Sequence, residues 1–82
     1  MNKDDIFKVI IRHISDIMPN LKDHVFQPND QLKELGVNSI DRADVITMSM
    51  ESLSLKVPLV EVAGAKNIGE LADVLYEKLQ VS

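Results

Sequence analysis

Apolar residues recur at helical spacing near both ends of the chain, and this periodicity restricts the fold more than any other feature. From Lys3 to Met18 they follow an i, i+3, i+4, i+7 pattern, while charged side chains occupy the opposite side. A second run extends from Ile68 towards Leu79. The apolar members of the first run are Ile6, Phe7, Ile10, Ile11, Ile14, Ile17 and Met18. We therefore predict two amphipathic helices, the first ended by Pro19.

A further helix is predicted to begin at Ser39 in the middle of the chain. Asn38 can cap this helix with its side chain, and Asp41, three residues on, complements the positive end of the helix dipole. We expect the helix to end near Ser54.

The segment from Leu21 to Val37 shows little periodicity and contains Pro28 and Gly36, so we expect a long ordered loop there. A connection of that length is unusual and is often functional. Its apolar residues, which we expect to pin it to the rest of the molecule, are Leu21, Val25, Phe26, Leu32 and Leu35.

The segment before the last helix contains signals for one more short helix. Pro58 suits the first position of a helix over residues 59–63, which Gly64 would end. Asn67 and Glu70 then form a second cap pair, at the start of the last helix.

A chain of 82 residues can build one domain with a modest core. The sequence thus predicts an all-α fold in a single domain over residues 1–82: a small antiparallel bundle of three main helices plus one short helix, four helices in all. A long loop joins the first and second helices.

Composition excludes several functions. The chain has no cysteine, and its two histidines have no second ligand type at metal-site spacing, so we expect neither disulfides nor a metal site. Nine basic and thirteen acidic residues give a net charge of −4, which disfavours binding to nucleic acids or anionic membranes and favours partners with basic patches. The charged N-terminal residues and the absence of an apolar run of about 20 residues predict a cytoplasmic protein, and we expect a monomer.

Ser39 is the main candidate for a modified residue. A serine at the start of a helix is exposed, and a phosphodiester attached to it would lie near free backbone N–H groups and the positive end of the helix dipole. The simpler interpretation is that a serine there only caps the helix. The local residues alone do not separate the two.

The helix that begins at Ser39 has two contrasting sides. At about 100° per residue, one side carries Val45, Ile46, Ser49 and Leu53, which we assign to the core. The opposite side mixes an aliphatic residue with two carboxylates, and Asp41 adds a third carboxylate nearby. We interpret it as a docking stripe for a basic, partly apolar partner, and it consists of Ile40, Asp44, Thr47 and Glu51.

The chain resembles the acyl carrier proteins over nearly all of its 82 residues. The likeness rests on the segment Leu35-Gly36-Val37-Asn38-Ser39-Ile40-Asp41, on the segment Asn67-Ile68-Gly69-Glu70-Leu71, on the length and on the acidic balance. It implies that a phosphopantetheinyl transferase attaches 4′-phosphopantetheine from coenzyme A to Ser39, with magnesium, and that an acyl group is carried as a thioester on this arm. It also implies a partner-docking surface made of Asn38, Ile40, Asp41, Asp44, Thr47, Met50, Glu51, Leu59 and Val60.

Within this family the chain is similar to the free-standing carriers of bacterial polyketide pathways. This likeness rests on the combination Asn-Ser-Ile-Asp-Arg-Ala-Asp with Ala-Gly-Ala-Lys-Asn-Ile-Gly-Glu-Leu-Ala-Asp, and within these carriers the chain is similar to those that donate acetyl groups for β-branching. The implied partners are an acyltransferase, a decarboxylating ketosynthase and a hydroxymethylglutaryl synthase-like enzyme. The group carried would be acetyl or malonyl.

Three positions and one segment depart from the usual family pattern. Asn38 stands where an aspartate is usual, which keeps the cap but removes a charge that helps to position the transferase's metal and coenzyme A. Arg42 adds a positive charge, and Met50 replaces a frequent glutamate, so the second helix is less acidic. The segment from Leu59 to Val62 is more apolar than in fatty-acid carriers. We expect part of it to be core and Leu59 or Val60 to offer an apolar contact to partners.

Two other functions remain open at this point. An aminoacyl, peptidyl or D-alanyl carrier would have the same bundle and serine, and a helical adaptor that is never modified would use Ser39 only as a cap. His13 and His24 show no nucleophile, base and orienting group that would converge, so we expect no catalytic activity.

Overall fold

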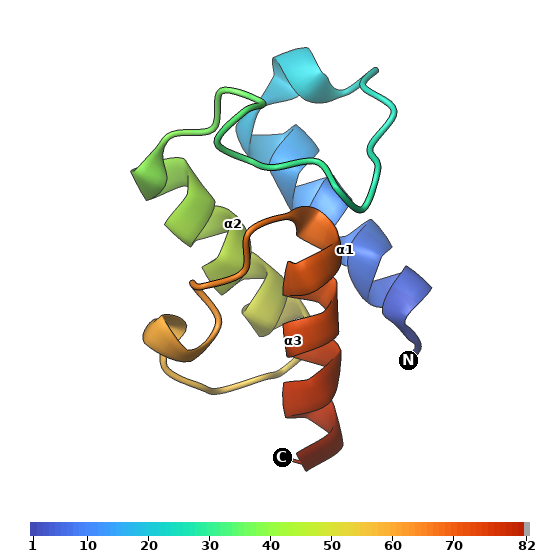
Figure 1. The fold of residues 1–82 in the computed structure, drawn as a ribbon, viewed down its shortest axis with the longest axis vertical. Helices are drawn as coiled ribbons and strands as arrows, with labels where there is room; N and C mark the ends of the chain where they lie inside the picture. Colours follow the sequence, from blue (N-terminus) through green and yellow to red (C-terminus); the bar gives the residue numbers. More distant parts are fainter. Residues whose placement is uncertain (82) are drawn as a thin grey trace.

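The computed structural model describes residues 1–81, and Ser82 lies outside the described residues. Three α-helices, α1 (Lys3–Ile17), α2 (Ser39–Ser52) and α3 (Ile68–Val81), account for the regular structure, together with two 3₁₀ turns, η1 (Pro19–Leu21) and η2 (Leu59–Glu61). Figure 1 shows α1 running in the opposite direction to α2 and α3. The all-α fold with three main helices is therefore confirmed, and the long loop joins α1 to α2 as predicted.

α1 begins with a capping box that the sequence analysis did not single out. The side chain of Asn2 accepts a hydrogen bond from the amide of Asp5 at 2.9 Å, and the Asp5 carboxylate accepts one from the amide of Asn2 at 3.2 Å. The helix ends at Ile17, next to Pro19 as predicted.

The core forms where α1 packs against both α2 and α3. All four residues assigned to the core side of α2 are buried, which confirms that prediction. The buried apolar residues are Ile6, Ile10, Ile14, Leu32, Val37, Val45, Ile46, Met50, Leu53, Leu55, Val62, Ile68, Leu71, Ala72 and Leu75. They come from the three helices and from the loops between them, so the loops are part of one core.

α2 ends at Ser52 rather than near Ser54. Ser54 has a positive φ of 55°, and its amide donates to the carbonyl of Glu51 at 3.1 Å. The amide of Leu55 donates to the carbonyl of Met50 at 2.8 Å. These two bonds form a Schellman motif, which satisfies the last carbonyls of the helix and turns the chain back towards the core.

The short helix predicted over residues 59–63 is present only as a 3₁₀ turn, which is shorter than expected. The segment forms only η2, and Pro58 precedes that turn with extended backbone instead of occupying its first position. The molecule is thus a bundle of three α-helices with two 3₁₀ turns within residues 1–81, and not a four-helix bundle. A single turn suffices because only Val62 of this segment is fully buried, while its neighbours Leu59 and Val60 remain exposed.

The long loop is held against the start of α3 by backbone hydrogen bonds. The amide of Gly69 donates to the carbonyl of Pro28 at 2.7 Å, and the amide of Ile68 donates to the carbonyl of Asp30 at 3.0 Å. A Cβ atom on Gly69 would lie 2.9 Å from both Cβ and the carbonyl oxygen of Pro28, so this contact requires glycine. Leu32 anchors the loop in the core as predicted, but Val25 is 76% exposed and does not pin it.

The Asp30 side chain shapes the same part of the loop. Its carboxylate accepts hydrogen bonds from the amide of Gln27 at 2.9 Å and from His24 Nε2 at 3.0 Å. The bond from the Gln27 amide, and then the one from His24, lower the pKa of Asp30 below its ordinary value of 3.8. His24 also stacks edge-on against Phe26, at 4.7 Å between ring centroids.

Candidate cofactor-attachment site at the start of α2

The start of α2 leaves a serine and two backbone amides accessible. The side chain of Asn38 accepts a hydrogen bond from the amide of Asp41 at 2.8 Å, and the carbonyl of Asn38 accepts one from the amide of Arg42 at 2.8 Å. This confirms Asn38 as the cap. Within residues 1–81 the amides of Ser39 and Ile40 donate to no protein group, and Ser39 is exposed. The helix therefore presents one hydroxyl beside two free N–H donors.

A turn at Gly36 sets the path of the chain just before Ser39. Gly36 has a φ of +86°, a left-handed conformation that other residues rarely adopt, and open space surrounds it. The next residue, Val37, is buried, and its amide donates to the carbonyl of Leu32 at 3.0 Å. This anchored residue holds the cap and Ser39 at one place on the surface.

Ser39 lines a cleft of about 400 Å³. α2 forms one wall, and the other walls come from residues 31–33 of the long loop, from η2, from the loop after η2 and from the start of α3. The volume lies in the usual range of small-molecule sites, about 300–1,000 Å³. The residues that line the cleft are Gln31, Leu32, Lys33, Ser39, Arg42, Ala43, Ile46, Leu59, Ala63, Ala65, Lys66, Asn67, Ile68 and Leu71.

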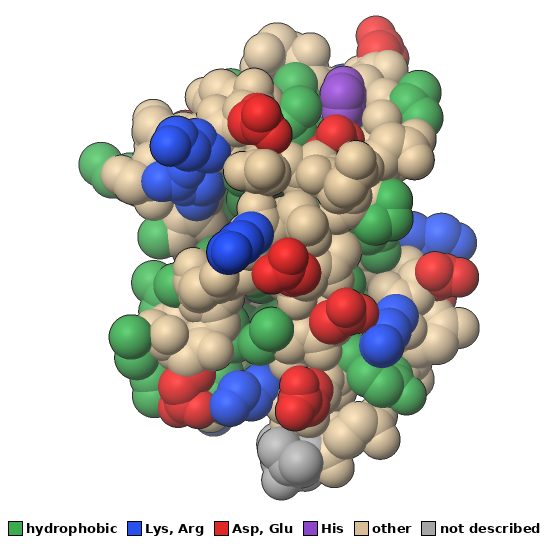
Figure 2. All heavy atoms as spheres, in the orientation of Figure 1, with side chains coloured by type: hydrophobic (Ala, Val, Ile, Leu, Met, Phe, Trp, Pro, Cys, Tyr) green, Lys and Arg blue, Asp and Glu red, His purple; other side chains and the backbone are tan. Residues whose placement is uncertain are grey.

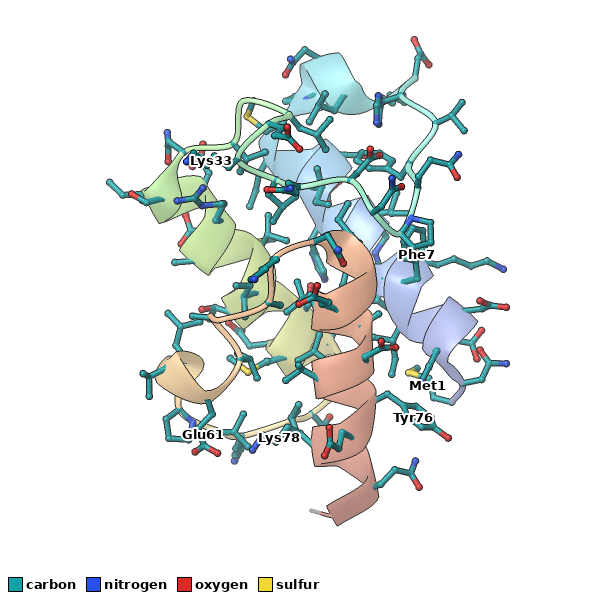
Figure 3. The ribbon with its side chains drawn as sticks, in the orientation of Figure 1. Met1, Phe7, Lys33, Glu61, Tyr76 and Lys78 are labelled. Atoms are coloured by element: carbon teal, nitrogen blue, oxygen red, sulfur yellow. The ribbon has the colours of Figure 1, made fainter. Side chains whose placement is uncertain are left out.

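The cleft is basic, although the chain as a whole is acidic. Lys33, Arg42 and Lys66 line it, no Asp or Glu does, and none of these three cations forms an ion pair within residues 1–81. Figure 2 shows blue side chains gathered over the upper left of the molecule, around the start of α2, and Figure 3 labels Lys33 there.

Sequence reasoning missed this basic cluster. The sequence analysis noted the positive charge of Arg42 but not the side of α2 on which this residue lies. Arg42 follows Ser39 by three residues and precedes the buried Val45 by three, so it lies on the inner side of α2. The helical spacing was a usable signal for Arg42. Lys33 and Lys66 come from separate loops, and no local pattern in the sequence brings them to the same cleft.

The opposite side of α2 carries the predicted docking stripe. Ile40 is 73% exposed, and Asp44, Thr47 and Glu51 are also exposed, while Asp41 is half-buried. These residues lie where the prediction placed them.

Met50 does not belong to the docking surface, because only 6% of it is exposed. Its carbonyl accepts the hydrogen bond from the amide of Leu55 that ends α2, and its side chain belongs to the core cluster. Its place in the predicted surface came from the family resemblance.

η2 adds an apolar contribution beside the cleft. Val60 is 81% exposed and Leu59 is 36% exposed, as expected for an apolar contact with partners. An ion pair between Lys78 Nζ and Glu61 Oε1, at 2.8 Å, ties this turn to α3, and Figure 3 shows the two side chains facing one another. The hydrogen bond with Glu61 raises the pKa of Lys78 above its ordinary value of 10.5.

The histidines lie away from Ser39. His13 is buried in α1, and its Nε2 lies 2.7 Å from the hydroxyl of Ser52, so the pair links α1 to the far end of α2. Ser52 is thirteen residues beyond Ser39, about 20 Å along the helix. In the part of the chain that the structure describes, no group of three or more His, Cys, Asp or Glu side chains could hold a metal ion. No helix among those residues is both long and apolar enough to cross a bilayer.

Known proteins resemble this chain in both sequence and structure. The family described as "Phosphopantetheine attachment site" matches residues 8–75. The polyketide biosynthesis acyl-carrier-protein AcpK of Bacillus subtilis (strain 168) is 56% identical over 80 residues, which is 98% of each chain. Hispidin synthase of Neonothopanus nambi is 28% identical over 82 residues, which span only 5% of that protein.

A solved structure has the same fold. It is the curacin biosynthetic pathway HMG synthase in complex with its acetyl donor-ACP, in which the matching chain is 50% identical and superposes with a TM-score of 0.88. The match covers 90% of the present chain and 95% of the solved one. An accessible serine and two free amides beside a cleft also fit a phosphodiester-linked arm. Together, these likenesses show that the chain belongs to the phosphopantetheine-binding acyl carrier proteins, whose cofactor is covalent 4′-phosphopantetheine.

Proposed function

We propose that this protein is a polyketide-pathway acyl carrier that bears 4′-phosphopantetheine on Ser39 and donates acetyl groups to a hydroxymethylglutaryl synthase-like enzyme. The observation that carries the proposal is the exposed Ser39 at the open start of α2, beside the cleft. The likeness to a donor carrier bound to its HMG synthase supports the choice of partner. Residues 1–82 act as a single, monomeric and cytoplasmic carrier unit that performs no catalysis of its own.

The residues around Ser39 suit the attachment reaction. A phosphopantetheinyl transferase removes the hydroxyl proton, and the Ser39 oxygen forms a bond to the diphosphate phosphorus of coenzyme A that carries the pantetheine. The bond from this phosphorus to the bridging oxygen breaks, and adenosine 3′,5′-bisphosphate leaves. The free amides of Ser39 and Ile40 and the positive end of the α2 dipole stabilise the resulting phosphodiester. The arm's terminal thiol then carries the acyl group as a thioester.

Partner enzymes dock on the outer side of α2 and on η2. Asp44 and Glu51 attract basic patches, while Ile40 and Val60 offer apolar surface that a partner can bury. An acyltransferase that loads the arm, a decarboxylating ketosynthase and the synthase-like enzyme would use this surface in turn. Charge-steered docking of modest strength allows rapid exchange between them.

The attachment site is tested by the intact mass of the protein after incubation with coenzyme A, magnesium and a broad-specificity phosphopantetheinyl transferase. Wild type and Ser54→Ala, which removes another exposed serine, should gain one phosphopantetheine, whereas Ser39→Ala should gain none. Ser39→Ala should keep its helicity because Asn38 provides the cap. A gain of mass by Ser39→Ala would exclude Ser39 as the attachment site. Loading with acetyl, malonyl or an amino acid then separates a polyketide carrier from an aminoacyl or D-alanyl carrier.

The docking surface is tested by charge reversal. Asp44→Lys and Glu51→Lys should weaken binding to a hydroxymethylglutaryl synthase-like enzyme by roughly two- to tenfold, with stability changed by less than about 0.5 kcal/mol. Asp16→Lys reverses an exposed charge on α1 instead and serves as the matched control. Equal binding by all four proteins would remove α2 from the interface.

A further inference from the structure

The cleft beside Ser39 contains more positive charge than the arm's phosphodiester can neutralise. A phosphodiester carries one negative charge, whereas Lys33, Arg42 and Lys66 contribute three positive charges and no lining carboxylate offsets them. The acidic residues of α2 lie on its outer side, so the helix separates a negative docking face from a positive cleft. Two cations therefore remain for a second anion.

The interior of the cleft suits a short acyl group. Its apolar lining includes the buried side chains of Leu32, Ile46, Ile68 and Leu71, while Lys33 and Lys66 are exposed and Arg42 is half-buried. An acyl group that places a carboxylate near these cations would keep its carbon atoms against apolar surface. A neutral acyl group would gain only the apolar contact.

Covalent attachment makes a weak attraction effective. Ser39 itself lines the cleft, so an arm on its hydroxyl begins inside the site, and the acyl group is present at a high effective concentration. An exposed ion pair typically changes an equilibrium by about two- to fivefold, which is enough to shift a tethered group between cleft and solvent.

We propose, on the basis of the proposed carrier function, that the cluster of Lys33, Arg42 and Lys66 binds, in addition to the phosphodiester, the free carboxylate of a dicarboxylic acyl group such as malonyl. Loss of the carboxylate as carbon dioxide, which leaves acetyl, removes this attraction. The carrier thus retains the group before decarboxylation and releases it to solvent and to the next enzyme afterwards. The cleft distinguishes the two loading states by charge.

The test compares three forms of the full chain: the arm with a free thiol, with acetyl and with malonyl, each transferred from the matching coenzyme A and checked by intact mass. Backbone amide chemical shifts report on the cleft, chiefly at Lys66, Asn67 and Ile68. Malonyl should shift these amides relative to the free-thiol form, and acetyl should shift them at least twofold less. Hydroxylamine cleavage gives a second measurement, in which each rate on the carrier is divided by the rate for the corresponding coenzyme A thioester. The normalised rate for malonyl should be about two- to fivefold lower than that for acetyl.

Variants of the cleft cations test whether binding of the malonyl carboxylate causes the shifts and the slower cleavage. Arg42→Gln and Lys66→Gln should each lose the malonyl-specific shifts and the slower cleavage, whereas Lys56→Gln, an exposed lysine outside the cleft, should retain both. Salt at 0.5 M should reduce the malonyl effect in wild type, because screening weakens exposed ion pairs.

Two results would overturn the inference. Equal shifts for acetyl and malonyl would mean that the cations serve only the phosphodiester, which the free-thiol form already contains. Unchanged malonyl shifts in both cleft variants would assign the effect to other residues. A failure of arm attachment, seen as no gain of mass, would instead refute the proposed function itself and this inference with it.

Discussion

The starts of α2 and α3 have similar local sequences but different surroundings. Each is capped by an asparagine, Asn38 or Asn67, whose side chain accepts a hydrogen bond from the amide three residues on. At α3 the first two amides donate to backbone carbonyls of the long loop. At α2 the corresponding amides, those of Ser39 and Ile40, donate to no group within residues 1–81. The cap defines a helix start, and the surrounding chain decides whether that start is structural or available to a ligand.

Glycine is required near both helix starts, for different reasons. Gly69 lies in α3 where Pro28 leaves no room for a side chain, whereas Gly36 lies in open space before α2 and has a positive φ. One glycine therefore satisfies a steric demand of tertiary packing, and the other satisfies a conformational demand of the backbone.

The largest loss of stability is expected from a substitution where α3 contacts the long loop. Gly69→Ala places a Cβ 2.9 Å from backbone and side-chain atoms of Pro28, so loop and helix must separate, at a cost of about 1–3 kcal/mol in the free energy of unfolding. Chemical denaturation measures this, with Gly64→Ala as the control, because no atom lies within 4 Å of a Cβ there. Equal stability of the two variants would show that the contact is not tight.

A somewhat smaller loss of stability is expected from a substitution of Gly36, in the turn before α2. Gly36→Ala should destabilise the fold by about 1–2 kcal/mol through its left-handed backbone conformation alone. Gly36→Asn should recover part of this loss, since asparagine tolerates that conformation, whereas Gly69→Asn should recover none relative to Gly69→Ala. If asparagine is no better than alanine at position 36, the backbone explanation is wrong.

The two caps should contribute equally to stability despite their different surroundings. Asn38→Ala and Asn67→Ala should each cost about 1 kcal/mol, measured by denaturation. Asn38→Asp should retain the stability, because aspartate caps equally well, and should speed phosphopantetheine transfer if the usual aspartate of the family helps the transferase. A much smaller loss of stability for Asn38→Ala would mean that contacts other than this cap stabilise the start of α2.

The smallest effect on stability is expected from Asp30, in the long loop that accepts hydrogen bonds from the first amides of α3. Because the pKa of Asp30 is lowered in the folded protein, its contribution to stability is complete above the ordinary value of 3.8 and is lost as the pH falls through the lowered pKa. Thermal unfolding from pH 7 to pH 2.5 should therefore show a steeper loss of stability below pH 3.8 for wild type than for Asp30→Asn. Asp23→Asn, which changes an exposed carboxylate in the same loop, should behave like wild type. Parallel curves for all three proteins would exclude a role for Asp30 in this range.

Local signals predicted the three α-helices and the exposed position of Ser39. Asn38 with Asp41, and Asn67 with Glu70, are contacts between residues three apart, so the sequence alone contains the information for both caps. The core face of α2 follows from helical spacing. The position and exposure of Ser39 follow from its place directly after a cap.

Features that depend on distant segments were not predictable in this way. Met50 lies at the edge of the core face of α2 and is only 6% exposed, which helical spacing alone did not indicate. The segment over residues 59–63 forms one 3₁₀ turn rather than a longer helix, and only Val62 in it is buried. The basic cleft combines a helix with two loops, so it emerges only once the loops are placed.

Because the loop is fastened at residues 28–30 to α3 and at Asn38 to α2, the seven residues from Gln31 to Val37 act as a spacer of set length. The exposed side chains along it, those of Gln31, Lys33 and Glu34, could change without consequence for this distance. A single inserted or deleted residue, by contrast, would displace Ser39 relative to the opposite wall of the cleft. At these three exposed positions the segment is therefore expected to tolerate changes of residue type much better than it tolerates changes of length.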